Sequence, residues 1–318
     1  MKRLILTSLL VAASSTVSAM TLSAPDLPGD GLIGSPPENP HYVIAKQEDT
    51  LIDIAVEHHL GQDHIVLANP TVDRWLPGAG TQVRIPNGFV LPDAPRQGVI
   101  INLPEMRLYY FPDAQKVITY SIGIGRVDWK TPMGKTRIQD KQANPSWTPP
   151  PSIIAEHLAD GDRLDPYYPP GPDNPLGLFA FKLGIPGYLI HSTNKVNGVG
   201  MRVSHGCIRM YPLDIEKFFP MIKVGTDVNI VNQSVKAGWY HNTLYVEVYP
   251  EMEETPASFE DRLHHALDLI AKVNGGKMPV IKASVLRDAI GQARGLPVPI
   301  YQRPTASPAQ STAPAISH

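Results

Sequence analysis

The side chains best suited to chemistry in this chain are one cysteine and the histidines near it. Cys207 is the only cysteine among the 318 residues, so it cannot form an internal disulfide. It lies in the segment Val203-Ser204-His205-Gly206-Cys207-Ile208-Arg209, and His191 is 16 positions before it. A thiol that follows a glycine and lies near histidines is a candidate nucleophile, because an imidazole can accept its proton. The first hypothesis is therefore an enzyme that acts through this thiol.

A thiol nucleophile needs a base, a group that orients the base, and donors for the oxyanion. His191 ends a predicted strand and is the candidate base, and the carbonyl of Ser192 can hold its second ring nitrogen. His205 and Gly206 predict a tight turn ahead of a helix, where successive N–H groups can form an oxyanion hole. Arg209 can bind a carboxylate or brace the loop.

Chemistry alone leaves other interpretations of these residues open. Free cysteine is most often a small buried hydrophobe, and His191 can equally be a core histidine with its hydrogen bonds satisfied. His205 can be a loop residue whose ring binds the backbone. A zinc site made of His191, His205 and Cys207 is a further possibility, with Asp214 as a conceivable fourth ligand. The His-x-Cys spacing is tight for two ligands of one metal ion.

The wider pattern around these residues resembles the signature of the L,D-transpeptidase catalytic domain. The matching segments are Ile190-His191-Ser192-Thr193-Asn194, Gly198-x-Gly200-x-Arg202-x-Ser204-His205-Gly206-Cys207-Ile208-Arg209, Thr131-Pro132-x-Gly134 and Gly171-Pro172-x-Asn174-Pro175-x-Gly177. The resemblance covers about residues 96–232. It implies a mainly β catalytic domain, a β-sandwich, with the nucleophile at the end of a cleft.

The resemblance also implies roles for individual residues. Cys207 would be the nucleophile, His191 the general base and the Ser192 carbonyl its orienting group. His205, Gly206 and Arg209 would be supporting motif residues. Many relatives have glycine where this chain has Ser192. The serine still provides the backbone carbonyl, but its backbone lacks the conformational freedom of glycine.

The function implied is that of an L,D-transpeptidase of the bacterial cell wall. Cys207 would take the acyl group of a peptidoglycan tetrapeptide stem as a thioester and pass it to an amine. The pattern is most similar to the enterobacterial-type branch of the family, which joins a LysM-like module directly to the catalytic domain. The amine would be a diaminopimelate side chain or, as resemblance to this branch implies, the C-terminal lysine of an outer-membrane lipoprotein. With water as acceptor the enzyme would be an L,D-carboxypeptidase. No cofactor and no metal are expected.

A non-catalytic peptidoglycan-binding protein is the alternative from another class of function. In that case the cysteine domain would be an inactive scaffold and the N-terminal module would hold glycan. The presence of His191, Gly206 and Cys207 together argues against it.

Residues 41–87 predict a small α+β module in the order strand, helix, helix, strand. Asp49 or Thr50 is the predicted N-cap of its first helix. The module resembles the LysM peptidoglycan-binding domain. The residues that carry this resemblance are Tyr42-Val43-Ile44, Asp49-Thr50-Leu51, Ile54-Ala55, Asn69-Pro70, Leu76-Pro77-Gly78 and Val83-Arg84-Ile85-Pro86. Glu48 stands where that family usually has glycine.

The rest of the chain predicts a β domain followed by helices. Residues 96–232 contain hairpin-spaced β runs that predict an antiparallel sheet, with a short helix over 212–221 and a final strand over 228–231. Residues 233–295 form an extension with two predicted helices. The Pro/Ala/Ser/Thr-rich residues 296–318 predict a disordered tail.

The N-terminal sequence indicates the cellular compartment, and the net charge limits the classes of binding partner. Residues 1–19 predict a signal peptide, with a positive start, an apolar run and the small residues Val17-Ser18-Ala19. Residues 20–40 predict an extended leader. We therefore expect a periplasmic protein without a transmembrane segment after signal cleavage. The net charge of -2 gives no basic footprint for nucleic acid.

Overall fold

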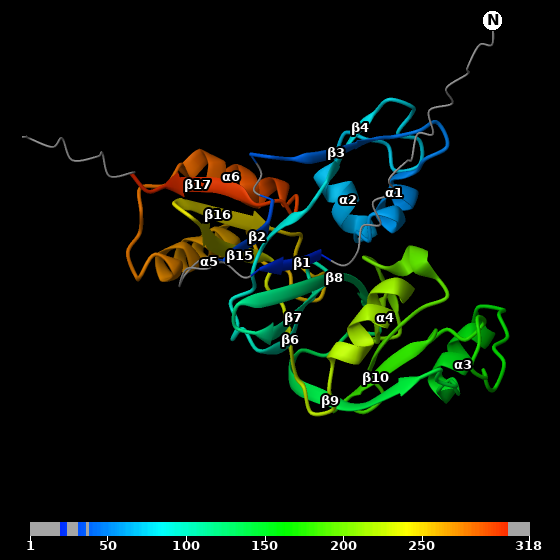
Figure 1. Cartoon of the computed structure of the whole chain (residues 1–318). Coiled ribbons are helices and arrows are strands. Elements are labelled where there is room, and N and C mark those ends of the chain that lie inside the picture. The colour runs from blue at the N-terminus through cyan, green and yellow to red at the C-terminus, as the bar shows by residue number, and fades with distance from the viewer. Residues whose placement is uncertain (1–19, 24–30, 36–37, 305–318) are drawn as a thin grey trace, which may run out of the picture.

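The structure is a computed structural model that describes residues 20–23, 31–35 and 38–304. These residues form an N-terminal module, a central β domain and a C-terminal lobe (Figure 1). The expected signal peptide at 1–19 and most of the expected tail, 305–318, lie outside the described residues. Among the described residues, no helix is long and apolar enough to cross a membrane.

The N-terminal module has the predicted order of elements. These are β3 (His41–Ile44), α1 (Leu51–Glu57), α2 (Gln62–Ala68) and β4 (Gln82–Ile85), with β3 and β4 antiparallel. Thr50 caps α1, because its side chain accepts from the Asp53 N–H while the Asp53 carboxylate accepts from the Thr50 N–H. Leu51, Ile65 and Val83 belong to a core separate from that of the β domain.

The central domain is built on strands with short helices between them. The strands are β1 (Met20–Ser23), β6 (Gly98–Asn102), β7 (Arg107–Asp113), β8 (Lys116–Gly125), β9 (Gly134–Ala143), β10 (Phe179–Leu183), β11 (Leu189–His191), β12 (Arg202–Ser204), β13 (Ile208–Met210) and β14 (Asp227–Val231). The helices are α3 (Pro151–Ala159), the 3₁₀ turn η1 (Val196–Gly198) and α4 (Pro212–Met221). The helix predicted over 212–221 is thus confirmed.

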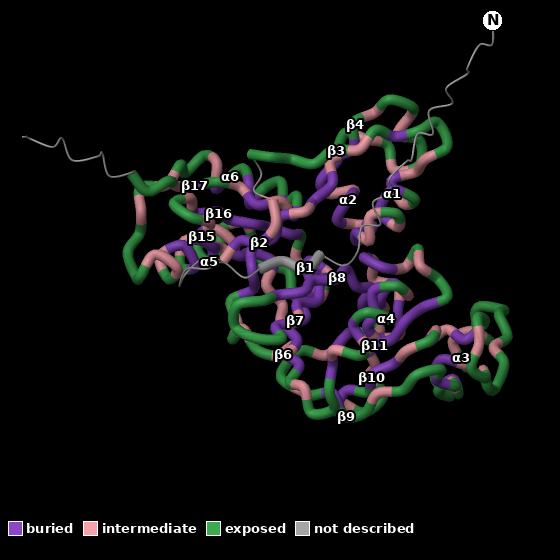
Figure 2. The backbone as a smooth tube through the Cα atoms, viewed as in Figure 1, coloured by how far each residue is buried: buried purple, intermediate pink, exposed green. Residues whose placement is uncertain are grey.

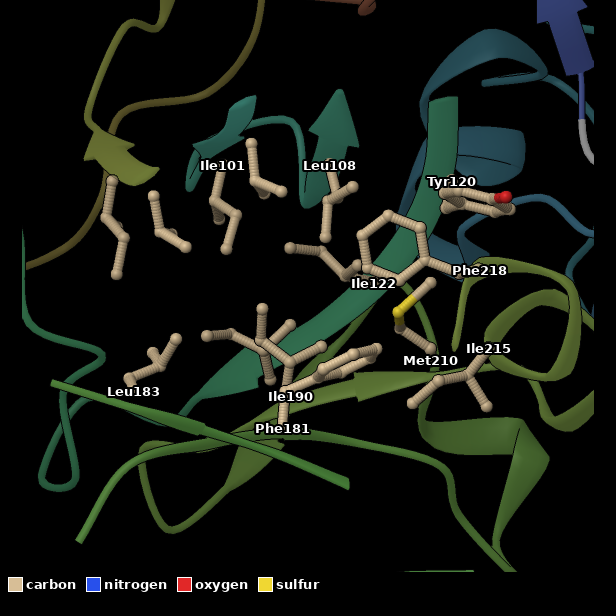
Figure 3. Packing of buried hydrophobic residues seen from close by; sticks show 14 of the residues in the cluster. Ile101, Leu108, Tyr120, Ile122, Phe181, Leu183, Ile190, Met210, Ile215 and Phe218 are labelled. Carbon is tan, nitrogen blue, oxygen red and sulfur yellow. The ribbon is translucent and has the colours of Figure 1, made fainter. Parts of the chain in front are cut away.

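The strands of this domain close on themselves. Their order is β8-β13-β11-β10-β9-β14-β6-β7, and β7 pairs again with β8. Two layers of apolar side chains face each other across the interior, one from β6, β7 and β8 and one from β10, β11, β13 and α4 (Figure 3). The Phe218 ring packs on Tyr120 and on Phe181, with ring centroids 5.3 Å and 5.5 Å apart. Figure 2 shows burial concentrated in these strands.

The sheet is antiparallel in most of its pairings, as predicted, but three pairings are parallel. β14 runs parallel to β6, β12 runs parallel to β8, and β11 runs parallel to β13. Neighbouring parallel strands need a long crossover rather than a tight turn. Residues 192–207 make that crossover between β11 and β13 and contain η1 and β12. The turn of His205 and Gly206 therefore leads into a strand and not, as predicted, into a helix.

Residues 20–40 are not an extended leader over their described part. β1 pairs antiparallel with β8, and β2 (Leu32–Gly34) pairs antiparallel with β5 (Gly88–Val90). Leu32 and Ile33 are buried. Two adjacent apolar residues in a Pro/Gly-rich stretch are enough to make a strand when a partner edge is available, and only the tertiary structure supplies that edge.

The C-terminal lobe has a sheet that the sequence did not predict. β15 (Val235–Tyr240), β16 (Thr243–Val248) and β17 (Val298–Gln302) form it, and α5 (Phe259–Val273) and α6 (Ala283–Gln292) share its core. Both helices are as predicted, and the strand predicted over 228–231 as the last of the β domain is confirmed as β14. Residues 298–302 are therefore not part of a disordered tail, because pairing with β16 buries Ile300.

Candidate active site

The parallel pairing of β11 with β13 brings the candidate base to the candidate nucleophile. Ile190 lies opposite Ile208, and His191 lies opposite Arg209. Both isoleucines are 0% exposed in the core of the β domain. Successive side chains of a strand point to opposite faces, so His191 and Arg209 share the face turned away from that core. Cys207 is two residues before Arg209, so continued alternation of side chains predicts that it lies on the same face.

His191 is held as a neutral base by its surroundings. Its side chain is 5% exposed, and its Nδ1 lies 2.5 Å from the carbonyl oxygen of Ser192. Because a carbonyl only accepts, Nδ1 carries the proton and Nε2 is left as an acceptor. Burial, together with the positive charge of Arg209, lowers the pKa of His191 to about 3. The ring is therefore neutral at neutral pH, with Nε2 as its unprotonated nitrogen.

A glycine in a distant segment makes room for Ser192. Gly177 has a φ of +63°, and a Cβ built on it would lie 2.6 Å from the Ser192 Cβ. The Ser192 N–H donates to the Phe179 carbonyl at 2.9 Å, and the residue has an ordinary negative φ. This strand end therefore does not need a glycine of its own. Gly177 belongs to the upstream motif Gly171-Pro172-x-Asn174-Pro175-x-Gly177, which therefore contacts the segment that carries the candidate base.

The Cys207 thiol is partly buried beside β11. Burial raises its pKa, while a hydrogen bond from the Leu189 N–H and the charge of Arg209 act in the opposite direction. The thiol also lies 3.7 Å from the Gly187 carbonyl oxygen. The resting pair is thus a neutral thiol and a neutral imidazole.

The turn before Cys207 is fixed through its carbonyl groups. The Gly206 carbonyl accepts from the Thr131 hydroxyl at 2.8 Å, and that hydroxyl accepts from the Gly125 N–H at 2.9 Å. The Ser204 hydroxyl donates to the Cys207 carbonyl. Gly206 has a φ of +95°, and a Cβ there would lie 2.7 Å from the Tyr188 ring. Glycine is required on both counts.

The N–H groups of this turn are available to a substrate. Among the described residues, no group accepts a hydrogen bond from the Gly206 or the Cys207 N–H. Two neighbouring unpaired amides beside a nucleophile are the donors that an oxyanion hole needs. The turn predicted as an oxyanion hole therefore offers two N–H donors without an acceptor among the described residues.

His205 points away from this pair and toward α3. Its Nε2 lies 3.2 Å from Glu156 Oε2, and its ring packs edge-on against Trp129 with centroids 5.1 Å apart. Burial, with the charges of Arg126, His157 and Arg209, lowers its pKa to about 4. His205 is thus a neutral supporting residue that anchors the turn. Sequence reasoning missed Glu156 and Trp129, since nothing in their local sequence marks them.

Arg209 is a cation with no counter-ion among the described residues. Its partial burial lowers its pKa from the ordinary value. Its guanidinium lies close to Gly198, where a Cβ would come within 3.3 Å of Nη1. An unpaired guanidinium beside a nucleophile can bind a carboxylate of a substrate.

The metal interpretation fails on the positions of its ligands. Asp214 lies 2.7 Å from His59 of the N-terminal module, and His205 is engaged by Glu156. Within the described part of the chain, no three His, Cys, Asp or Glu side chains are grouped so that they could hold a metal ion.

The chain is similar to a known family over most of its length. Residues 96–230 match the family described as the L,D-transpeptidase catalytic domain, YkuD. The probable L,D-transpeptidase YbiS of Escherichia coli is 38% identical over 295 residues, which cover 91% of this chain and 94% of that relative. The probable L,D-transpeptidase YcfS of Escherichia coli is 42% identical over 71% of this chain and 72% of its own length. The probable L,D-transpeptidase ErfK/SrfK of Escherichia coli is 37% identical over 92% of this chain and 94% of its own length.

Proposed function

Since this chain belongs to the L,D-transpeptidase family, we propose that Cys207 is its nucleophile and that it acts on peptidoglycan tetrapeptide stems. The observation that carries this proposal is the parallel register of β11 and β13, which pairs His191 with Arg209, two residues after Cys207. The neutral state of His191 supports its role as base.

The first half of the reaction forms a thioester. His191 Nε2 takes the proton of the Cys207 thiol, and the sulfur attacks the carbonyl carbon of the third stem residue. The N–H groups of Gly206 and Cys207 hold the resulting oxyanion, and losing such a donor costs about 100- to 1000-fold in rate. The bond to the terminal D-alanine then breaks, and its amine leaves with the proton from His191.

The second half transfers the acyl group. An amine attacks the thioester carbonyl, His191 takes a proton from that amine, and Cys207 regains it as the thiol leaves. The acceptor is either the side-chain amine of a diaminopimelate in another stem or the C-terminal lysine of an outer-membrane lipoprotein. Water in the same place would release a tripeptide stem, which is the L,D-carboxypeptidase reaction.

Arg209 binds a stem carboxylate in this proposal. Its guanidinium lacks a counter-ion among the described residues and shares the face of the reacting pair. A charge-assisted bond to the stem would place the scissile carbonyl against the thiol, which is the positioning that gives proximity its large effect.

The N-terminal module is proposed to be LysM-like and to hold glycan. Tyr42, Ile44, Trp75 and Leu76 are large apolar side chains exposed on it. Exposed apolar and aromatic side chains suit contact with sugar rings. Together with the signal-like residues 1–19, this supports a periplasmic enzyme that works on the wall.

The test uses the mature protein with tetrapeptide muropeptides, with and without a peptide that ends in the lipoprotein-type lysine. Mass spectrometry identifies crosslinked, peptide-linked or trimmed products, and so names the acceptor. Cys207→Ser should fold and give none of them. Unaltered products from that variant would refute the mechanism, and binding to sacculi without any product would favour the non-catalytic alternative.

A further inference from the structure

A pocket of about 280 Å³ lies where the three parts of the molecule meet, away from Cys207. Its walls come from α2 of the N-terminal module, from the turn between β6 and β7, from Gly200 and Arg202, and from residues 249–253. No role in the proposed reaction has been given to it.

The pocket is built on a fixed backbone seam. The Gln62 N–H donates to the Val199 carbonyl at 3.3 Å, and the Asp63 N–H donates to the Gly200 carbonyl at 3.1 Å. Gly61 and Gly200 are in such close contact that a Cβ on Gly200 would lie 2.1 Å from the Gly61 Cα. The cavity therefore does not depend on the position of one flexible side chain.

The charge of the pocket lining is mainly negative. Asp63, Glu105, Glu251 and Glu253 line it, against the single cation Arg202. Arg202 is engaged, because its guanidinium donates to Glu254 at 2.8 Å and to the Gly125 carbonyl at 3.3 Å. Glu105 and Glu251 have their own partners in Lys236 and Arg262.

Two of these carboxylates still have capacity to bind a cation. Glu253 is exposed and has no partner among the described residues. Asp63 is bound only through one oxygen, which lies 3.2 Å from Arg74. The pocket therefore favours a positively charged ligand.

A buried ring nitrogen adds a further acceptor. His64 lines the pocket and is 4% exposed. Its Nε2 lies 2.7 Å from the Gly295 carbonyl, so that nitrogen carries the proton and Nδ1 is an acceptor. Among the described residues, nothing donates to Nδ1. A buried acceptor without a donor is costly, and a hydrogen-bond donor from a ligand or a bound water would satisfy it.

The remaining walls are apolar. Val66, Leu67, Met106 and Met252 contribute to them. The hydrogen-bond acceptors and carboxylates suit a cationic group that donates hydrogen bonds. The apolar walls suit an alkyl chain attached to that group. We propose that this pocket binds the primary alkylammonium side chain of a lysine or another diamino acid within a peptide.

The place of the pocket suggests its use, a step that rests on the proposed function. Arg202 lies on β12, which runs directly into the catalytic turn that ends at Cys207. The proposed acceptors are amine-bearing peptides. A second amine of such a peptide, held here, would retain the acceptor near the thioester and raise its effective concentration.

The test measures binding without turnover. Isothermal titration of full-length mature Cys207→Ala protein uses Nα-acetyl-lysine amide as the probe, with the norleucine analogue as the uncharged control. The lysine probe should bind more tightly, and added salt should weaken it. Glu253→Gln should lower its affinity about two- to fivefold, as expected for an exposed charge pair.

Two further variants decide the location. Leu67→Trp fills the pocket and should abolish binding of the lysine probe, with circular dichroism confirming that the protein folds. Glu260→Gln removes an exposed carboxylate on α5 and should leave the affinity unchanged. Equal binding of both probes, or full binding by Leu67→Trp, would overturn the pocket proposal. Either outcome leaves the chemistry of Cys207 untouched, and a wild-type enzyme that forms no product would not alter the binding result.

Discussion

Glu156 on α3 lies 3.2 Å from His205, two positions before the candidate nucleophile. The other oxygen of the same carboxylate accepts from Arg126, which follows β8. One carboxylate thus joins the loop that carries α3 to the strand and the turn that shape the site. His157, the next residue on α3, also stacks on His205, with ring centroids 5.9 Å apart.

Glu156→Ala should lower kcat more than it raises KM. The variant frees the turn at His205, and a shift of about 1 Å in a reacting group costs up to about 100-fold in rate. We expect a fall in kcat of about ten- to a hundredfold in the muropeptide assay, with little change in Tm. Asp160→Ala, at the exposed C-cap of the same helix, is the control. A kcat equal to that of wild type would show that the contact does not position the turn.

The reactivity of Cys207 should be low at neutral pH and should increase under alkaline conditions. Burial raises the pKa of the thiol, and the pKa of His191 is lowered to about 3. At a pH above the lowered pKa of His191 and below the raised pKa of Cys207, both groups are neutral. A thiolate–imidazolium pair is therefore not the resting state. The rate of alkylation by iodoacetamide should therefore show no plateau between about pH 5 and pH 7.

His191→Gln serves as the comparison for this measurement. If the base matters only during attack on a carbonyl, the variant should keep a similar alkylation profile and lose transpeptidation. A plateau in the wild-type profile at acidic pH that disappears in the variant would mean that the ion pair exists at rest.

Gly200→Ala should separate the N-terminal module from the catalytic segment. Gly200 has a φ of +78°, and its added Cβ would lie 2.1 Å from the Gly61 Cα. Gly276 has a φ of +80° with nothing within 4 Å, so Gly276→Ala is a matched control that carries the backbone strain alone. Strain of that kind costs about 1–2 kcal/mol.

The measurement is limited proteolysis together with chemical denaturation. Gly200→Ala should be cut faster between the module and the β domain and should lose more stability than Gly276→Ala. Equal losses of stability in both variants would mean that the close contact between Gly61 and Gly200 adjusts to the new Cβ without a further loss of free energy.

Lys236→Met should destabilise the protein strongly. The Lys236 ammonium lies buried between Glu105 and Glu247, at 3.0 Å from the latter, and both carboxylates are 0% exposed. Removing the cation leaves two buried carboxylates facing each other, and breaking a buried pair in this way costs about 3–5 kcal/mol. Burial already raises the pKa of Glu247 to about 7 with the lysine present.

Urea unfolding checks this prediction. Lys236→Met should be more stable at pH 5 than at pH 8, because a carboxyl with a raised pKa takes up a proton in the folded state and loses that advantage as the pH rises. Adding Glu247→Gln should recover part of the loss. If Lys236→Met alone were as stable as wild type, the group of Lys236, Glu105 and Glu247 would contribute nothing to the stability of the junction between the β domain and the C-terminal lobe.

Local sequence was sufficient for the elements that depend on neighbouring residues. Thr50 and the apolar spacing behind it predicted α1, and Phe259 with its helical repeats predicted α5. In the same way, His205 and Gly206 predicted a tight turn, and Gly206 has a φ of +95° in it. These features rest on capping, periodicity and backbone freedom, which act over a few residues.

Features that depend on distant partners were missed. Leu32 and Ile33 form a strand because residues 88–90 provide a strand edge to pair with. Residues 298–302 form a strand because β16 provides such an edge. The local sequence of neither segment indicates which strand it pairs with. The contact of Glu156 with His205 joins residues 49 positions apart and left no local signal for the same reason.

The chain itself determined which groups are available for the reaction: a single thiol, an imidazole 16 residues earlier, and a glycine turn with an arginine beyond it. Tertiary structure decided that β11 and β13 run side by side and parallel, with Ile190 facing Ile208 in the core. That pairing sets His191 beside Arg209, two residues after Cys207. The physical reason is that a hydrophobic core selects the register of strands far apart in sequence, and the register in turn fixes which polar side chains meet.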